Sequence, residues 1–283
     1  MLPLLLVLLA LGPYVPRIEE WRRKAEAALG TDDGWLTVAG LYWLKEGENR
    51  FGTAEGLAIV LPPGSAPAEA GVFKFRAGRT TVTFAPGVAA MVNGRPAASA
   101  ELKPDSAGKP DLVALGGLTM FVIQRGDRYG IRLRDRNSRF RREFTGRKWF
   151  PVNEDYRIEA RFVPYDPPRK LAVPNVLGQK DEMPSPGRVI FRWQGRELSL
   201  EPVVSDQRLW FIFKDGTAGK ETYPAGRFLY AGAPVNGTVI LDFNQAVNPP
   251  CAFTPYATCP LPPRRNWLPV RIEAGELTYH AAP

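Results

Sequence analysis

The sequence predicts a mainly β protein with one helix near its start, then a β-sandwich, then an antiparallel β meander or partly open barrel. Three observations predict this fold class. Apolar and polar residues alternate over many short runs, which is the pattern of half-buried strands. Turn signals separate those runs, and the 28 prolines and 27 glycines are spread along all 283 residues. One segment near the start repeats its apolar residues at helical spacing instead.

The first twelve residues predict export. They read MLPLLLVLLALG, which is too short for an ordinary transmembrane helix but has the length of the apolar part of a signal peptide. Ala10-Leu11-Gly12 offers small residues for cleavage, although no Lys or Arg precedes the apolar run. We expect residues 1–16 to be a signal peptide or, if uncleaved, an N-terminal anchor. The protein would then lie in the periplasm or on the extracellular face of the membrane.

The next segment predicts a helix followed by a β-sandwich. Ile18, Trp21, Ala25 and Leu29 recur at helical spacing within Arg17–Leu29, and Gly30 ends the helix. Apolar residues from Thr31 to Leu44 lead into the first strand. Later strands are expected at Ala58–Leu61, Val72–Arg76, Thr80–Phe84, Met91–Val92, Leu118–Gln124 and Tyr129–Leu133. The turns between them are Pro62-Pro63-Gly64, Ala77-Gly78, Asn93-Gly94 and Gly126-Asp127.

The second half predicts a bridge strand and an antiparallel meander. Residues 156–162 alternate apolar and polar side chains with period two. Further strands are expected at Gly187–Trp193, Glu197–Pro202, Leu209–Lys214, Glu221–Tyr230 and Thr238–Phe243. We therefore expect three parts: the leader 1–16, a helix plus β-sandwich over 17–145, and an antiparallel β domain with a Cys-linked, proline-rich loop over 146–283.

The positive charge of the chain is scattered. The formal charge is +8 and the isoelectric point is about 9.6, but the longest basic clusters are Arg22-Arg23-Lys24, Arg139–Arg142 and Arg264-Arg265. No motif of a nucleic-acid-binding module accompanies them. A solvated basic surface is therefore the favoured interpretation, and we expect no nucleic-acid partner and no membrane contact except through the leader.

The single histidine excludes several kinds of chemistry. His280 lies near the C-terminus, where it is expected to be a solvated end residue. Ser-His-Asp and Cys-His catalysis and His-built metal sites are therefore not expected, and no metal site is predicted. The stretch Asp215 to Thr222 contains Gly-Lys near a Thr, but its spacing does not fit a phosphate-binding loop, and a hairpin turn is the better interpretation.

The two cysteines predict a disulfide. Cys251 and Cys259 lie eight residues apart in the proline-rich stretch NPPCAFTPYATCPLPP. A ring of this size would stabilise the folded protein by about 2.5 kcal/mol in the loop-entropy model. The alternatives are a metal pair or two free thiols, but metal sites want closer cysteines and further ligands.

Polar residues gather in the last quarter of the chain, and two interpretations stay open. They are Asp215, Thr217, Glu221, Tyr223, Arg227, Asp242, Asn244, Asn248, Asn266 and Glu276. Strand alternation would place Glu221, Tyr223 and Arg227 on one side of a strand, with Asp242 and Asn244 on one side of the next. The first interpretation is a structural network of ion pairs. The second is a binding site for a polar or anionic ligand.

In the second interpretation each residue has a role. Arg227 would hold the anion, helped by Thr217, Asp242, Asn244 and Glu276. Asp215, Glu221 and Tyr223 would be the catalytic residues, as acid, base, cation ligand or hydrogen-bond donor. Whether the protein is an enzyme, and which cofactor it would use, stays open.

At these residues the chain resembles a bacterial family of unknown function, DUF 1684, over about residues 19–277. The resemblance is carried by Trp35-Leu36-Thr37, Gly40–Gly47, Asn49–Gly52, Arg132–Asp135, Phe213–Phe228, Leu241–Asn244, Asn248–Thr254, Ala257–Pro262 and Ala274–Glu276. Because no activity is established for that family, the resemblance identifies relatives and implies no reaction.

The first half also resembles forkhead-associated (FHA) domains. Gly47–Leu61 followed by Val92-Asn93-Gly94 has their rhythm, and the resemblance implies their β-sandwich fold. FHA domains bind phosphothreonine through an Arg just after the first glycine and a Ser/His pair. Here Thr53 follows Gly52, and no His occurs in this half. Two functions are therefore predicted. The first is binding, with or without hydrolysis, of a small polar or anionic ligand in the C-terminal domain. The alternative is a non-catalytic envelope protein that binds a protein partner through the FHA-like half.

Overall fold

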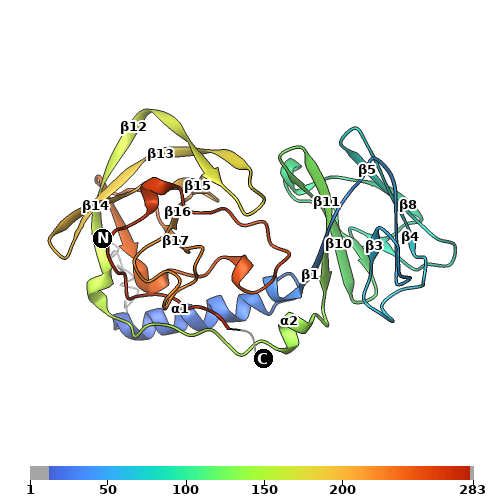
Figure 1. Cartoon of the computed structure of the whole chain (residues 1–283), viewed down its shortest axis with the longest axis horizontal. Coiled ribbons are helices and arrows are strands. Elements are labelled where there is room, and N and C mark those ends of the chain that lie inside the picture. Colours follow the sequence, from blue (N-terminus) through green and yellow to red (C-terminus); the bar gives the residue numbers. More distant parts are fainter. Residues whose placement is uncertain (1–12, 281–283) are drawn as a thin grey trace, which may run out of the picture. The chain divides into compact units, whose positions relative to one another are not determined.

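The computed structural model describes residues 13–280 and is mainly β, as predicted (Figure 1). Strands hold 44% of the residues and helical segments 14%. Helix α1 spans Tyr14–Leu29 and so begins three residues before the predicted start at Arg17. Pro16 lies in its first turn, where a missing backbone N–H is tolerated. The apolar run of residues 1–12 lies outside the described residues, and no helix that the structure describes is long and apolar enough to cross a membrane.

The chain forms two units that do not follow sequence order. Among the described residues, unit 1 consists of the chain up to Ala28, Thr145–Ala252 and Thr258–His280. Unit 2 consists of Leu29–Phe144 and Phe253–Ala257. Helix α1, which we expected in one part with the sandwich, therefore belongs with the C-terminal strands. A five-residue piece of the proline-rich loop belongs to unit 2.

Unit 2 contains two β-sheets, which are the predicted β-sandwich. One has the strand order β1-β11-β10-β9-β6-β7, and the other has the order β3-β2-β4-β5-β8. The first is built from β1 (Val38–Trp43), β6 (Met91–Val92), β7 (Arg95–Pro96), β9 (Val113–Leu115), β10 (Leu118–Arg125) and β11 (Arg128–Asp135). The second is built from β2 (Gly47–Gly52), β3 (Ile59–Val60), β4 (Gly71–Arg76), β5 (Arg79–Phe84) and β8 (Ser99–Leu102).

Short elements and tight turns complete unit 2. The 3-10 helices η1 (Trp35–Thr37) and η2 (Asp105–Ala107) and the one-turn helix α2 (Arg139–Arg142) lie outside the sheets. Ala77 and Gly78 join β4 to β5 with left-handed φ angles of 46° and 82°, as the hairpin prediction requires. Inward side chains such as Phe51, Phe73 and Met120 are fully buried between the sheets and form one core.

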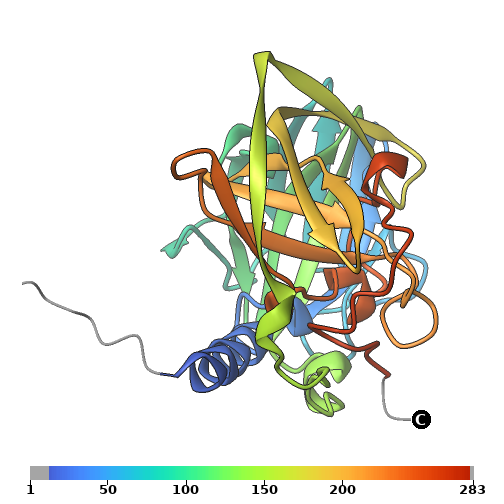
Figure 2. The same cartoon turned by 90° about the vertical axis from the view of Figure 1, so that its left-hand side faces the viewer.

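Unit 1 contains two further antiparallel sheets, one of which curls into half a barrel (Figure 2). One sheet has the order β14-β13-β12-β18 and the other β15-β16-β17. Their bounds are β12 (Arg157–Pro174), β13 (Lys180–Trp193), β14 (Arg196–Leu200), β15 (Val203–Ser205), β16 (Arg208–Phe213), β17 (Arg227–Ala231) and β18 (Thr238–Asp242). One 3-10 helix, η3 (Glu154–Tyr156), precedes these strands, and three follow them: η4 (Phe243–Gln245), η5 (Pro250–Ala252) and η6 (Arg264–Asn266). Buried side chains including Phe211, Phe213 and Phe243 form a second core.

One predicted strand of unit 1 is wrong over half its length. Residues 214–226 form a loop, so β17 begins at Arg227 and not at Glu221. The loop closes on itself, because the carbonyl of Thr217 accepts hydrogen bonds from the backbone N–H groups of Lys220, Glu221 and Thr222. Glu221 and Tyr223 therefore do not share a strand face with Arg227. The predicted strand Thr238–Phe243 likewise ends at Asp242, whose side chain caps η4.

The long β12–β13 hairpin bends back onto the proline-rich loop. At its tip, Val176 N–H donates to the carbonyl of Cys259 at 3.0 Å, and Leu261 N–H donates to the carbonyl of Pro174 at 2.6 Å. Asn175 and Pro260 form a bridge between the same segments. Backbone hydrogen bonds therefore hold this loop of many prolines in place.

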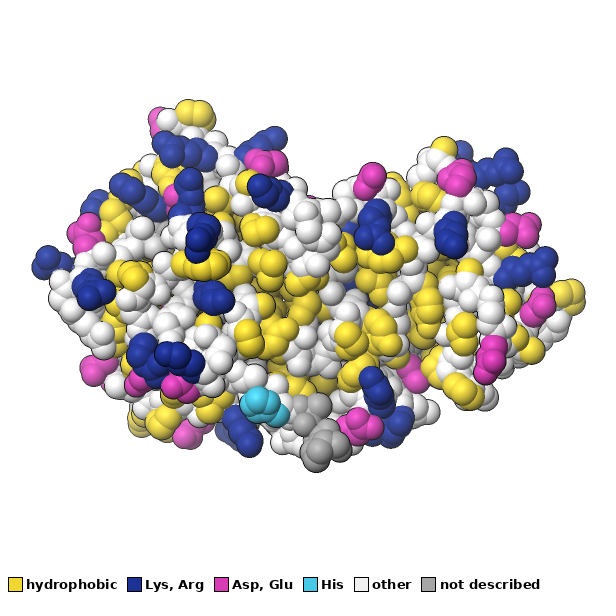
Figure 3. Space-filling view, in the orientation of Figure 1, with side chains coloured by type: hydrophobic (Ala, Val, Ile, Leu, Met, Phe, Trp, Pro, Cys, Tyr) yellow, Lys and Arg dark blue, Asp and Glu magenta, His cyan; other side chains and the backbone are white. Residues whose placement is uncertain are grey.

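Charge is dispersed on the surface. On the face shown in Figure 3, Lys and Arg side chains lie singly or in small groups, with Asp and Glu side chains between them. Exposed ion pairs of the described residues include Arg79 with Glu101 at 2.6 Å and Arg271 with Glu221 at 2.8 Å.

Candidate functional site

Arg227 and Asp215 form a buried ion pair in unit 1. Arg227 is the first residue of β17 and lies opposite Phe213, the last residue of β16. Its Nη2 donates to Asp215 Oδ1 at 3.2 Å and to the carbonyl of Ile272 at 3.0 Å, and its Nη1 donates to the carbonyl of Ala274. Thr217 Oγ1 and Ile272 N–H also donate to the Asp215 carboxylate. The predicted acid and arginine are thus neighbours.

This pair is enclosed by protein. The Arg227 residue is 1% exposed and Asp215 is 7% exposed. Burial lowers the pKa of the Arg227 guanidinium, and the attraction of Asp215 opposes that effect. Because its terminal N–H groups face protein acceptors and solvent does not reach it, the geometry fits the structural interpretation of Arg227 better than an anion-holding one.

Two other predicted residues contact Tyr14, the first residue of helix α1. Asp242 Oδ1 accepts a hydrogen bond from the Tyr14 hydroxyl at 2.8 Å. Asn244 donates from Nδ2 to the Tyr14 oxygen and to the carbonyl of Asn153, both at 2.8 Å. Burial, followed by the hydrogen bond to Asp242, raises the pKa of Tyr14. Asp242 and Asn244 therefore fasten the helix to the sheet and do not face Arg227.

Glu276 forms a third, separate cluster. It is fully buried and accepts hydrogen bonds from the guanidinium of Arg147 and from Asn248 N–H, the latter at 2.7 Å. Asn248 donates from Nδ2 to the carbonyl of Leu277 at 2.8 Å. Arg147 also lies over the ring of Trp149. Like the Asp215–Arg227 pair, this cluster joins chain segments within the folded unit.

The remaining predicted residues lie in loops. Thr217 is buried and its hydroxyl lies 2.8 Å from that of Thr222. The Glu221 carboxylate pairs with Arg271. Burial raises the pKa of Tyr223, which lies near Cys251 and Cys259. Cys251 N–H donates to Cys259 Sγ at 3.2 Å, but the two sulfur atoms are not at bonding distance, so the disulfide stays a prediction.

The buried pair holds a segment that lines an open pocket. Asp215 accepts from Ile272 N–H, and Arg227 donates to the carbonyls of Ile272 and Ala274. The alternate residues of this segment, Arg271 and Glu273, point the other way and line a pocket of about 420 Å³. The pocket is formed by Tyr156, Gln194, Arg196, Pro269, Val270, Arg271 and Glu273. Asp215 and Arg227 thus hold the backbone of one wall of the pocket by hydrogen bonds.

Two arginines of this pocket differ in their partners. Arg271 pairs with both Glu221 and Glu273, each at 2.8 Å, and these hydrogen bonds raise its pKa. Arg196 donates only a long hydrogen bond of 3.5 Å to the carbonyl of Pro269. Within residues 13–280 no acidic side chain lies within ion-pair distance of Arg196. Its charge is therefore available to a ligand.

Tyr156 forms the apolar side of the pocket. Its ring packs on Trp193 with the ring centres 4.6 Å apart, and its hydroxyl accepts from Glu273 N–H at 3.3 Å. Burial raises the pKa of Tyr156, so the hydroxyl is neutral at ordinary pH.

The sequence analysis did not predict the residues of this pocket. The signal that could have indicated them was the alternation of Val270, Arg271, Ile272 and Glu273 before Glu276.

The described residues also bear on metal binding and on histidine chemistry. No group of three or more His, Cys, Asp or Glu side chains suited to a metal ion occurs in the part of the chain that the structure describes. His280 is exposed.

Comparison with known proteins supports the resemblance in the second half. The model of a family described as a protein of unknown function (DUF1684) matches residues 142–277. This match confirms, over that part of the chain, the resemblance that the residue motifs predicted for residues 19–277. No curated protein matches the chain.

Solved structures with similarity include an uncharacterized protein and FHA domains. The uncharacterized protein, from Haloarcula marismortui, is 28% identical over 49% of this chain and 79% of its own, with a TM-score of 0.41. The FHA domain of FhaA, complexed with the intracellular domain of another protein, is 16% identical over 33% of this chain and 97% of its own, with a TM-score of 0.24. An FHA domain studied for phosphothreonine-dependent interactions is also 16% identical, covers 33% of this chain and 92% of its own, and has a TM-score of 0.24.

Proposed function

We propose that unit 1 binds a small anionic ligand in the pocket lined by Tyr156, Arg196 and Arg271. The observation that carries the proposal is Arg196, an exposed guanidinium at a concave site with no acidic partner among the described residues. A planar guanidinium suits a carboxylate or a phosphate, because it offers two parallel N–H donors to two oxygens. The ligand class is therefore a small carboxylate or phosphate compound.

The neighbouring charges favour binding of an anion. Arg196 and Arg271 carry two positive charges at the pocket wall, and Glu273 is its one acidic lining residue. Glu273 already pairs with Arg271. An anion placed against Arg196 would therefore meet one unneutralised cation and, on the other side, the neutral ring and hydroxyl of Tyr156.

The same geometry favours binding without catalysis. Glu273, the acidic residue of the pocket lining, and Glu221 both pair with Arg271. The hydrogen bond from Arg271 lowers the pKa of Glu221, which makes that carboxylate a poorer general base and keeps it ionised. The roles predicted for Asp215, Glu221 and Tyr223 thus become structural ones in this proposal.

Thermal unfolding in the presence of citrate and of inorganic phosphate tests the proposal. We expect one or both anions to raise the Tm of the wild-type protein above that in potassium chloride of equal ionic strength, because a ligand that binds only the folded state stabilises it. Arg196→Gln should abolish that rise. Arg192→Gln removes the same charge from an exposed position of β13 outside the pocket and should retain it. Equal responses of the wild type and Arg196→Gln would reject the site.

We also propose that the protein is exported and that Cys251 and Cys259 form a disulfide in the oxidising compartment. The apolar run of residues 1–12 supports export, and the eight-residue spacing of the cysteines supports the ring. Mass spectrometry of protein recovered from its native host should show a chain that lacks the leader, or, if the leader is an uncleaved anchor, membrane fractionation should recover the full chain with the membrane. Thiol labelling of the denatured, unreduced protein should find no reactive cysteine; two labelled thiols would refute the disulfide.

A further inference from the structure

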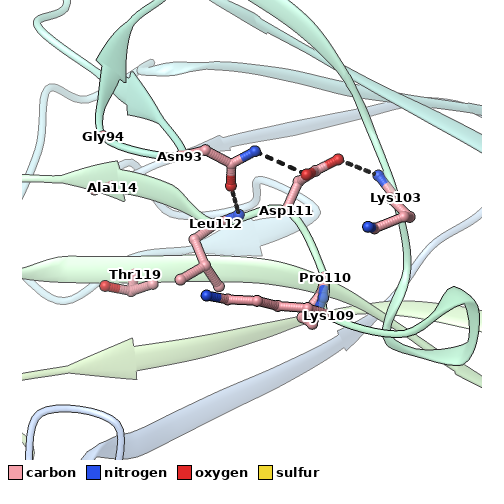
Figure 4. Close-up of a pocket in the computed structure, with 9 residues that line it drawn as sticks. All are labelled: Asn93, Gly94, Lys103, Lys109, Pro110, Asp111, Leu112, Ala114 and Thr119. Atoms are coloured by element: carbon pink, nitrogen blue, oxygen red, sulfur yellow. Dashed lines mark hydrogen bonds between the residues drawn. The ribbon is translucent and has the colours of Figure 1, made fainter.

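Unit 2 contains a second pocket, which is independent of the anion site proposed for unit 1. Its volume is about 500 Å³, and it lies between the turn Asn93-Gly94, the loop 103–112 and the outer face of strands β9 and β10 (Figure 4). We propose that this pocket binds an acidic segment of a protein partner, so that unit 2 is an interaction module and unit 1 a ligand-binding one.

The frame of the pocket is fixed by hydrogen bonds. The Asn93 side chain donates to Asp111 Oδ1 at 2.8 Å and accepts from Leu112 N–H at 2.9 Å. Lys103 N–H donates to the other Asp111 oxygen at 2.7 Å. Figure 4 shows these three bonds along the upper wall. The turn and the loop are therefore held together before any partner arrives, which lowers the entropic cost of binding.

The only acid of the pocket lining is already satisfied. Partial burial acts to raise the pKa of Asp111, but the hydrogen bonds from Lys103 N–H and the Asn93 side chain, with the charge of Lys103, hold it below its ordinary value. Asp111 is thus a carboxylate with both oxygens bonded. It therefore stays ionised, and the two lysines of the lining outnumber its single negative charge.

Two ammonium groups remain for a partner. Lys103 and Lys109 both line the pocket, and neither forms an ion pair within the described part of the chain. Lys109 extends along the pocket toward Thr119 in Figure 4. With Asp111 counted, the lining carries an excess of one positive charge, so an acidic segment complements it.

Apolar surface beside the lysines favours a peptide over a bare ion. Ala114 lies opposite both Met91 on β6 and Thr119 on β10, so the three side chains share one face of the sheet. Met91 is 45% exposed, although it is a large apolar residue. A peptide that carries acidic side chains would cover Met91 and Ala114 while its carboxylates meet the lysines, whereas an inorganic anion would use the lysines alone.

Fluorescence anisotropy with the full chain tests the proposal. The probe is a fluorescein-labelled peptide of alternating Glu and Leu residues, and its Gln-for-Glu analogue is the uncharged control. We expect the acidic peptide to bind, and the double variant Lys103→Gln/Lys109→Gln to bind it at least tenfold more weakly. Lys74→Gln/Lys170→Gln removes the same two charges from exposed positions outside the pocket and should keep the wild-type affinity.

Further arms separate this site from the alternatives. Met91→Ser should weaken peptide binding several-fold, and Arg196→Gln should leave it unchanged, because the unit 1 site is not involved. Equal weakening by the two double lysine variants would show a general charge effect and overturn the proposal. Displacement of the peptide by inorganic phosphate at equal ionic strength, with no effect of Met91→Ser, would show an anion site without a peptide preference and would also overturn it.

Discussion

Among the described residues, Arg227 is the largest side chain that the protein buries completely. Removing such a residue lowers the free energy of unfolding mainly because its ion-pair partner is then left buried and unpaired. Arg227→Met would leave Asp215 buried without its cation, and we expect a loss of about 3–5 kcal/mol in the free energy of unfolding. Urea denaturation at neutral pH measures it.

A matched pair of variants separates the ion pair from the arginine itself. Asp215→Asn/Arg227→Met removes both charges and should recover part of the lost stability. Arg208→Met, at an exposed position of the neighbouring strand β16, should change stability little. If Arg227→Met folds with wild-type stability but loses anion binding, then Arg227 itself holds the ligand and our structural assignment is wrong.

Tyr230 makes stability sensitive to alkaline pH. Burial raises the pKa of Tyr230 to about 12, whereas in the unfolded chain the value is about 10. Above pH 10 the unfolded state therefore releases a proton that the folded state keeps. The free energy of unfolding then falls as pH rises, by up to about 1.4 kcal/mol per pH unit from this group, until the folded-state pKa is reached.

We expect Tyr230→Phe to show a shallower loss of stability than the wild type between pH 10 and 12, in denaturation curves recorded at each pH. Tyr129→Phe, on β11 of unit 2, serves as the control. Parallel curves for the wild type and Tyr230→Phe across this range would contradict the argument.

Single residues of the site were predictable only as a group. The sequence showed Asp215, Glu221 and Arg227 as polar residues close together, but strand alternation grouped the arginine with Glu221 and Tyr223 on one strand face. The structure pairs it with Asp215, because the loop 214–226 replaces the first half of the predicted strand. Arg196 could not be distinguished in the sequence, where it is one of many scattered basic residues. Its distinction is tertiary: Glu221 and Glu273 pair with Arg271, whereas no described acidic side chain pairs with Arg196.

At the scale of elements, Gly275 shows how tightly the C-terminal segment is packed. Its φ is +82°, and a Cβ there would lie 2.6 Å from the carbonyl oxygen of Ala246 and 2.7 Å from that of Phe243. We expect Gly275→Ala to lower the free energy of unfolding by roughly 2–4 kcal/mol, since backbone atoms cannot move aside easily and the φ angle is unfavourable for alanine. Thermal or urea denaturation measures the loss.

Gly237→Ala is the matched control for that variant. Gly237 has a φ of +75° in a hairpin turn, but a Cβ there meets nothing within 4 Å. Only the conformational cost, about 1 kcal/mol, applies to it. Equal losses for the two variants would show that the close contacts at Gly275 relax at no cost.

Turn chemistry made some elements predictable, and buried polar residues hid others. Ala77-Gly78 and Asn93-Gly94 marked hairpins correctly, because their left-handed φ angles suit few residues. Strand β2 was missed, because its sequence Glu48-Asn49-Arg50 looks like a solvated loop. The structure buries Asn49, whose Nδ2 donates to the carbonyl of Lys45 at 2.8 Å. A buried polar side chain that bonds to the backbone of neighbouring residues leaves no apolar pattern to detect.

At the scale of the molecule, the two units have separate cores. Phe73 is fully buried in unit 2 and Phe211 in unit 1. Phe73→Ala and Phe211→Ala should each cost about 3–5 kcal/mol. In differential scanning calorimetry, we expect each substitution to lower a different part of the thermal transition.

One calorimetric result would contradict separate unfolding of the two units. If both variants shift one single, symmetric transition by similar amounts, the two cores unfold together and the division into units has no energetic meaning. Leu57→Ala, at a half-buried loop position outside both cores, is the control for an apolar truncation that creates no internal cavity.

The division into units also determines when each one can finish folding during synthesis. Unit 2 includes Phe253–Ala257, where the buried Thr254 hydroxyl donates to the carbonyl of Val38 at 2.9 Å. The ribosome releases Val38 more than two hundred residues before Thr254. Helix α1 emerges earlier still, yet its partners Asp242 and Asn244 come near the end. Neither unit can therefore reach its final structure on a nascent chain that stops short of residue 257, and the order in which the parts are made is not the order in which they are completed.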